Sequence, residues 1–234
     1  MFRLLLILSL LTFYQPSYAG EDTVNQAVAR YLTRIHKYME EEDWENAERE
    51  LIQTARRYFK NEDSYERALI NQLYGQFYAL QRDYKSAIPW FEKALAKSRL
   101  PFAADLQVTY SLSQCYFQTG RYKDVIKTLE NYRVKASKRS QNMAPVQLMV
   151  LGIAYFQEAD ILNAYANISE ANATATKLNE EWLQYEFALA VKLEKFDEAI
   201  NVGQFLVFVN PEKKSYWKQL RGGYYGSESE GLSL

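Results

Sequence analysis

A short motif that recurs five times at nearly constant spacing constrains this chain more than any other feature. In each copy a small residue follows an aromatic or large aliphatic residue by three positions. The small residues are Ala47, Ala87, Val125, Ala164 and Ala199. Their successive intervals are 40, 38, 39 and 35 residues. Self-similarity at such a period is typical of helical repeat proteins, so we expect stacked units along most of the chain.

Residues on either side of the motif predict that each unit is a hairpin of two helices. Twelve positions before each small residue stand Ile35, Gly75, Ser113, Gly152 and Phe187, and three residues later come Tyr38, Tyr78, Tyr116, Tyr155 and Ala190. One turn after the small residue come Leu51, Phe91, Leu129 and Ile168. Residues three or four apart share a helix face, so both helices carry an apolar stripe. One hairpin cannot bury both stripes, so neighbouring hairpins must stack.

These residues resemble the tetratricopeptide repeat (TPR) family, and the segment from Leu73 to Ala94 fits its pattern best. The resemblance implies an all-α, right-handed superhelical solenoid of about five helix-turn-helix repeats with an incomplete C-terminal capping helix. We place the array at residues 20–213, a partial sixth helix at 214–225 and a tail at 226–234. The repeats are expected near residues 28–61, 68–101, 106–139, 145–178 and 180–213.

The first nineteen residues have the pattern of a secretory signal peptide. Arg3 precedes an apolar run from Leu4 to Phe13, and Ser17 and Ala19 are the small residues of a cleavage site before Gly20. An uncleaved anchor is the alternative, but about ten apolar residues are too few to span a bilayer. We therefore expect a periplasmic protein, cleaved after Ala19 and without a membrane-spanning segment after cleavage.

Composition and the reactive side chains argue against enzymes and nucleic-acid binders. The net charge is −1, which offers no basic excess for nucleic acid. Cys115 is the only cysteine and is expected to be a buried small hydrophobe rather than a nucleophile. His36 is the only histidine and cannot form a metal site or a triad alone. No phosphate loop, HExxH helix or CxxC is present. We expect no catalytic residue, metal or cofactor.

Three polar features each have two interpretations. The acidic run Glu40 to Asp43 is expected to be a solvated turn, the alternative being a calcium or partner site. The basic stretch from Arg133 to Arg139 is expected to be a solvated helix end, the alternative being a site for anionic lipid or an acidic partner. Asn167 and Asn172 begin Asn-x-Ser/Thr triplets, which matter only if the source glycosylates exported proteins.

The resemblance places partner binding on the concave wall, at outward positions of each first helix. By register, the expected groove residues are Gln72, Gln76, Tyr110, Gln114, Phe117, Met149, Ile153, Phe156 and Gln184. This wall lacks the Lys, Arg and Asn set with which one branch of the family clamps a C-terminal carboxylate. A peptide or helix with an apolar face fits better, anchored at Tyr110, Phe117, Met149 and Phe156. The alternative is that Met149 and Ile153 belong to the core.

The C-terminal segment suggests a more specific role. After Asn210-Pro211 a sixth first helix begins, with Trp217 and Leu220 at their repeat positions. A signal peptide, five repeats and the Tyr-Trp-Lys-Gln-Leu segment together resemble periplasmic repeat proteins encoded beside TonB-ExbB-ExbD systems of gammaproteobacteria, a longer family.

This resemblance implies an accessory of TonB-dependent uptake that binds another envelope component. A general adaptor in envelope assembly, cell division or secretion is the second hypothesis, and a catalytic protein is a distant third. Self-association through Trp217 and Tyr224 is a further expectation.

Overall fold

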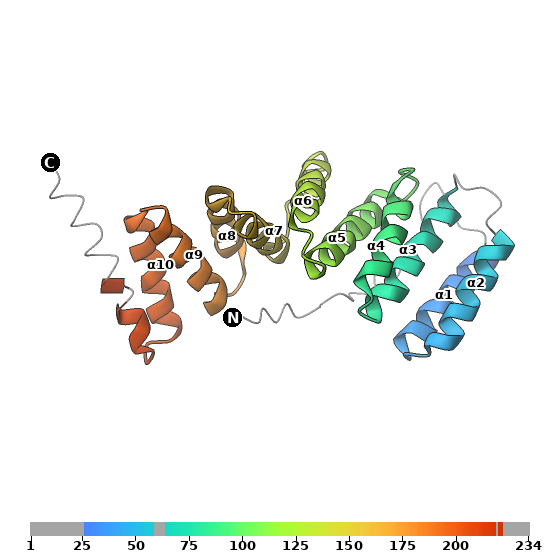
Figure 1. The fold of residues 1–234 in the computed structure, drawn as a ribbon, viewed down its shortest axis with the longest axis horizontal. Helices are drawn as coiled ribbons and strands as arrows, with labels where there is room; N and C mark the ends of the chain where they lie inside the picture. Colours follow the sequence, from blue (N-terminus) through green and yellow to red (C-terminus); the bar gives the residue numbers. More distant parts are fainter. Residues whose placement is uncertain (1–25, 59–63, 219, 222–234) are drawn as a thin grey trace. The chain divides into compact units, whose positions relative to one another are not determined.

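The computed structural model describes residues 26–58, 64–218 and 220–221, and these residues form helices joined by short turns (Figure 1). The helices are α1 (Gln26–Glu40), α2 (Trp44–Tyr58), α3 (Tyr65–Leu80), α4 (Tyr84–Leu95), α5 (Phe102–Gln118), α6 (Tyr122–Ser137), α7 (Pro145–Gln157), α8 (Ile161–Thr174), α9 (Glu180–Lys192) and α10 (Phe196–Val209). Residues 214–218 and 220–221 are also helical. The described ranges contain no strand, so the all-α prediction is confirmed. The predicted signal peptide and the tail at 226–234 lie outside the described residues.

The chain divides into two compact units at the turn of the third hairpin. The first unit comprises residues 1–120 and the second comprises residues 121–234. In the first unit, α1 packs on α2, α2 on α3, α3 on α4 and α4 on α5. In the second, α6 packs on α7, α7 on α8, α8 on α9 and α9 on α10. The third hairpin contributes α5 to the first unit and α6 to the second.

The recurring small residues lie at the centre of this packing. All five, Ala47, Ala87, Val125, Ala164 and Ala199, are 0% exposed. The residues one turn further along the second helices, Leu51, Phe91, Leu129 and Ile168, are buried as well. Since a short side chain lets two helices approach and a long one fills the adjacent space, the predicted register of the hairpins is confirmed.

The turn inside each hairpin follows one backbone pattern. Its left-handed residues are Glu42, Arg82, Gly120, Ala159 and Glu194, and their spacing repeats that of the small residues.

 The φ angles of these five residues are 55°, 62°, 72°, 62° and 58° in chain order. After three of them an aspartate caps the second helix: the Asn46, Ser86 and Asn163 amides donate to Asp43, Asp83 and Asp160 at 3.1 to 3.2 Å. A left-handed residue followed by a carboxylate cap closes one helix and starts the next, which fixes the hairpin geometry.

Candidate functional site

The first unit carries five of the predicted groove residues on two first helices. Gln72 and Gln76 lie on α3, and Tyr110, Gln114 and Phe117 lie on α5. Gln72 and Tyr110 are 38 residues apart, as are Gln76 and Gln114, so they hold equivalent positions in successive hairpins. All five side chains are half-buried. We call these five residues the first-helix face.

The two glutamines of the first-helix face have acceptor oxygens that the described part of the chain leaves unused. The Oε1 atoms of Gln72 and Gln76 are buried and accept no hydrogen bond there. A buried acceptor without a donor costs about 1–3 kcal/mol. A water molecule can supply such a donor, and a partner's peptide N–H can do so once the glutamine side chain turns toward the solvent.

In the second unit, Met149 and Ile153 are not surface anchors. Their side chains are 2% and 3% exposed, which corrects their assignment as exposed groove residues and agrees with the core alternative. The physical reason is the composition of α7, in which Leu148, Val150 and Leu151 are buried too. Because residues 147–154 of α7 are all buried, this stretch of the helix has no side left for a groove.

The other two predicted groove residues of the second unit have different surroundings. Phe156, at the end of α7, is exposed and remains available to a partner. Gln184 on α9 is half-buried, and its Nε2 atom donates to the Tyr216 hydroxyl at 2.5 Å. Gln184 therefore already takes part in an intramolecular contact.

Tyr216 anchors the C-terminal helical segment, a role that the sequence analysis did not assign. It is buried in a cluster with Leu183, Phe187, Ala199 and Leu206. Its hydroxyl donates to Glu180 and accepts from Lys213 Nζ at 2.7 Å. The signal was present: Ile70 and Val108 are apolar at the corresponding register positions, one residue before Asn71 and Thr109.

Trp217 is exposed, and its Nε1 atom donates to the Pro211 carbonyl at 2.9 Å. Tyr224, its predicted partner in self-association, lies outside the described residues. The structure therefore leaves the self-association hypothesis untested.

The reactive side chains have environments that suppress their chemistry. Burial raises the pKa of the Cys115 thiol to about 12, so the nucleophilic thiolate is scarce at neutral pH. Burial lowers the pKa of His36, which favours the neutral imidazole. Within the described ranges, no group of three metal-ligating side chains comes together. None of the described helices is both long and apolar enough to cross a membrane.

The acidic run is a turn in which one carboxylate has a structural task. Glu40, Glu41 and Glu42 are exposed, whereas Asp43 caps α2 and also accepts from the Asn46 side chain at 2.5 Å. Capping explains why an aspartate stands at this point, so the turn interpretation accounts for the run.

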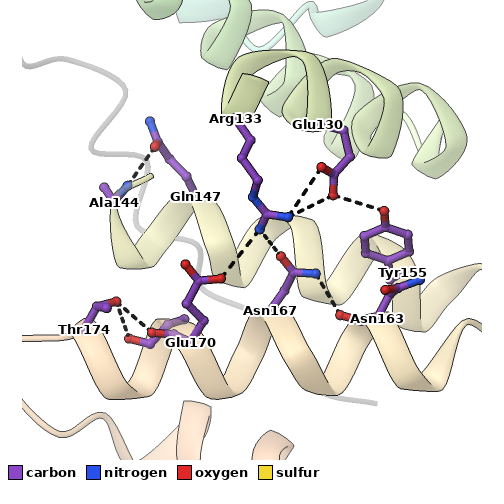
Figure 2. Close-up of polar contacts among 10 residues, drawn as sticks. Glu130, Arg133, Ala144, Gln147, Tyr155, Asn163, Asn167, Glu170 and Thr174 are labelled. Atoms are coloured by element: carbon purple, nitrogen blue, oxygen red, sulfur yellow. Dashed lines mark hydrogen bonds and ion pairs between the residues drawn. The ribbon is translucent and has the colours of Figure 1, made fainter. Parts of the chain in front are cut away.

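The basic stretch contains one residue that is not a solvated helix end. Figure 2 shows Arg133 of α6 reaching between Glu130 on its own helix and Asn167 and Glu170 on α8. Tyr155 of α7 donates to the same Glu130 carboxylate at 3.1 Å. Burial, followed by the Glu130 charge, raises the pKa of Tyr155 to about 12. These contacts join α6, α7 and α8, so Arg133 stabilises the second unit, while Lys138 and Arg139 are exposed as predicted.

Both glycosylation triplets begin with a side chain that the fold uses. Asn167 is buried; it accepts from Arg133 and donates to the Asn163 carbonyl at 2.8 Å. Asn172 is half-buried and donates to the buried Glu186 carboxylate at 2.7 Å. A glycan on either amide would break these hydrogen bonds, so the folded chain is a poor acceptor at both positions.

Comparisons with known proteins support the tetratricopeptide repeat fold. Residues 32–104 match a family model described as a tetratricopeptide repeat. A tetratricopeptide repeat protein from Parabacteroides merdae ATCC 43184 is similar with a TM-score of 0.61 and 13% identity, over 89% of this chain and 76% of that chain. Pseudomonas aeruginosa pilF is similar with a TM-score of 0.59 and 18% identity, over 82% of this chain and 80% of that chain.

A third solved structure is PilW, described as a widely conserved type IV pilus biogenesis factor. Its TM-score is 0.51 at 16% identity, over 85% of this chain and 99% of that chain. A comparison with curated proteins found no match. At these identities the likeness concerns the fold.

Proposed function

We propose that this chain, whose fold is that of tetratricopeptide repeat proteins, is a non-catalytic protein-interaction scaffold that binds a partner peptide or helix at its first-helix face. The observation that carries the proposal is the pair of unused acceptor oxygens on Gln72 and Gln76 of α3, together with the half-buried rings of Tyr110 and Phe117 on α5, the next first helix. Aromatic rings bury large apolar area, and the amides hydrogen-bond a backbone. Together they suit a peptide better than a charged small molecule.

The proposed location and system are the periplasm and TonB-dependent uptake. The signal-peptide pattern ending at Ala19 supports export. The resemblance of the repeats and of the segment containing Trp217 to periplasmic proteins encoded beside TonB-ExbB-ExbD systems supports an accessory role in uptake. The partner in this proposal is another envelope protein.

Envelope assembly, cell division or secretion is the alternative, and one observation favours it. PilW, which shares the fold, is described as a type IV pilus biogenesis factor. The two proposals predict different deletion phenotypes. A loss of growth on iron chelates alone supports the uptake role, whereas a defect in outer-membrane integrity on every iron source supports the assembly role.

Affinity capture from an envelope extract tests the binding face. The bait is the chain from Gly20 to Leu234, compared with a variant carrying Tyr110→Ala and Phe117→Ala and with a second variant carrying Gln72→Ala and Gln76→Ala. Val134→Ala, on an exposed side chain of α6, is the control. We expect a TonB-system component to bind the unmodified chain and the control and to be lost from both variants.

The variant with Gln72→Ala and Gln76→Ala shows whether binding can be lost while the chain stays folded. The melting temperature of this variant should equal or exceed that of the unmodified chain. The substitutions remove two buried acceptors that have no hydrogen bond, and with them the free-energy cost of burying these acceptors. If both variants retain the same partners, the first-helix face is not the binding site. If the unmodified chain captures only assembly factors, the uptake role is wrong.

A further inference from the structure

The helical residues 214–218 and 220–221 have an exposed side at a position that is closed in four of the earlier hairpins. Trp217 stands in the register position that Asn71, Thr109, Leu148 and Leu183 hold in four earlier first helices. Those four residues are 5%, 2%, 1% and 2% exposed, whereas Trp217 is 49% exposed.

The fifth hairpin shows what kind of element covers this position. Leu183 of α9 lies in one apolar cluster with Ala199, Val202 and Leu206 of α10, the second helix of its own hairpin. The element that closes the position is therefore a helix with an apolar stripe containing a small residue. No described helix covers Trp217 in this way.

The segment that presents Trp217 is itself firmly docked. Tyr216 is buried, and its hydroxyl contacts Glu180, Gln184 and Lys213. On the other side, Leu220 packs against α10, because a Cβ atom added at Gly203 would lie 3.1 Å from Leu220 Cδ1. Trp217 is thus held on a supported helix, which reduces the entropy that a partner must overcome on binding.

Three basic residues lie close to Trp217 along the helix. Lys214 and Arg221 lie three residues before and four residues after Trp217, on the same side of the helix, and Lys218 is its neighbour. All three are exposed, and within the described ranges none of them forms an ion pair, unlike Lys213, which contacts Glu180 at 2.9 Å. We call Lys214, Trp217, Lys218 and Arg221 the Trp217 face.

These charges decide between two occupants. A second copy that pairs symmetrically through this face would bring its own Lys214 and Arg221 against the same residues, and like charges repel. An acidic amphipathic helix instead offers a small or apolar stripe to the indole ring and carboxylates to the cations. We propose that the Trp217 face binds an acidic amphipathic helix of a partner protein, which packs on the indole ring as α10 packs on Leu183.

This site is separate from the first-helix face, so either proposal can fail without the other. The probe is a synthetic, dye-labelled amphipathic peptide helix with an Ala/Leu stripe flanked by glutamates, compared with the same helix carrying lysines instead. Fluorescence anisotropy with the chain from Gly20 to Leu234 measures binding. We expect the glutamate peptide to bind and the lysine peptide to bind at least about tenfold more weakly.

Three variants make the test specific. Trp217→Ser should weaken binding of the glutamate peptide at least about tenfold, as expected of a central aromatic anchor. Lys214→Glu with Arg221→Glu should exchange the preference, losing the glutamate peptide and gaining the lysine peptide. Phe208→Ser, on a 77% exposed ring of α10 outside the face, should change nothing. Circular dichroism checks that each variant is folded.

Two results would overturn the proposal. One is equal binding of the two peptides, or no binding of either, by the unmodified chain. The other is a concentration-dependent dimer in sedimentation velocity that Trp217→Ser abolishes, because a second copy would then occupy the face.

Discussion

Gly75 of α3 and Phe91 of α4 fit together so closely that a methyl group at Gly75 would overlap the ring. A Cβ atom added at Gly75 would lie 2.5 Å from Phe91 Cδ1 and 2.6 Å from Cε1. Gly152 and Ile168 repeat the relationship in the second unit, with Cγ1 at 2.6 Å. The absence of a side chain on the first helix thus makes room for a large one on the second.

We predict that Gly75→Ala destabilises the first unit despite the better helix propensity of alanine. The propensity gain is about 1 kcal/mol, but overpacking a well-packed core costs about 1–3 kcal/mol, so the net change is a loss or close to zero. Gly203→Ala is the matched control, because its added Cβ would meet the movable end of Leu220 at 3.1 Å. In urea unfolding, the free energy of unfolding of Gly75→Ala should be well below that of Gly203→Ala. The reverse order contradicts the packing argument.

The fifth hairpin reverses the sizes of this pair. Phe187 and Gly203 are 16 residues apart, like Gly75 and Phe91, but here the large residue is on the first helix. A Cβ atom added at Gly203 would lie 3.4 Å from Phe187 Cε2. Gly203 stands four residues after Ala199, the position that Phe91 holds after Ala87 in the second hairpin. Because packing requires a combined volume rather than a fixed residue at each position, the exchange leaves the hairpin intact.

The hairpin turns allow a second prediction, based on two equivalent residues. Gly120 and Ala159 are both left-handed, with φ of +72° and +62°. A Cβ atom at Gly120 would meet nothing within 4 Å, so Gly120→Ala adds only backbone strain, about 1 kcal/mol. Ala159→Gly should relieve strain of similar size, reduced by the greater chain entropy of glycine in the unfolded state. Thermal unfolding should therefore show opposite shifts for the two substitutions. Shifts in the same direction would rule out strain as the dominant effect.

Periodicity predicted the buried framework well because packing determines it. Ala47, Ala87 and Ala164 are completely buried where the spacing places them. It failed for Met149 and Ile153, since an apolar helix gives the same sequence signal whether one side or all sides are covered. It also missed the role of Arg133, because a salt-bridge partner on another helix, here Glu170, depends on tertiary placement and has no fixed spacing.

The Arg133 contacts lead to a third prediction. Asn167→Ala removes both the acceptor for Arg133 and the donor to the Asn163 carbonyl, and it leaves a half-buried guanidinium less satisfied. Lost hydrogen bonds of this kind cost about 1–3 kcal/mol. Asn131→Ala, on an exposed side chain of α6, is the control and should cost less than about 0.5 kcal/mol. Equal stability of the two variants in urea unfolding would show that the contacts in Figure 2 contribute little.

The buried thiol gives a fourth prediction. With its pKa raised by burial to about 12, Cys115 should react with iodoacetamide at pH 8 about a thousandfold more slowly in the folded chain than in guanidinium, where the pKa returns to its ordinary value near 9.0. Mass spectrometry at timed intervals measures the labelled fraction. Complete labelling of the folded chain within the time that the unfolded chain requires would contradict the burial of this residue.

Glu180 gives the last prediction, which concerns pH. A hydrogen bond from Tyr216, then one from Lys213, lowers the pKa of Glu180 below its ordinary value of 4.5. The folded state therefore prefers the carboxylate, so this stabilisation is present above pH 4.5 and disappears as the pH falls through the lowered pKa. The melting temperature of the unmodified chain should exceed that of Glu180→Gln at pH 7, and the difference should narrow as the pH approaches 3.

Glu212→Gln, on an exposed side chain close to Lys213 in sequence, is the control for this pH series. The melting temperature of Glu212→Gln should stay close to that of the unmodified chain from pH 7 to pH 3, because the exposed Glu212 side chain has no ion pair within the described ranges. A constant difference between the unmodified chain and Glu180→Gln from pH 7 to pH 3 would contradict the linkage. The stabilisation by Glu180 would then come from its shape and hydrogen bonds, which glutamine fails to reproduce. The charge of the carboxylate would not hold Tyr216 and the C-terminal segment in place.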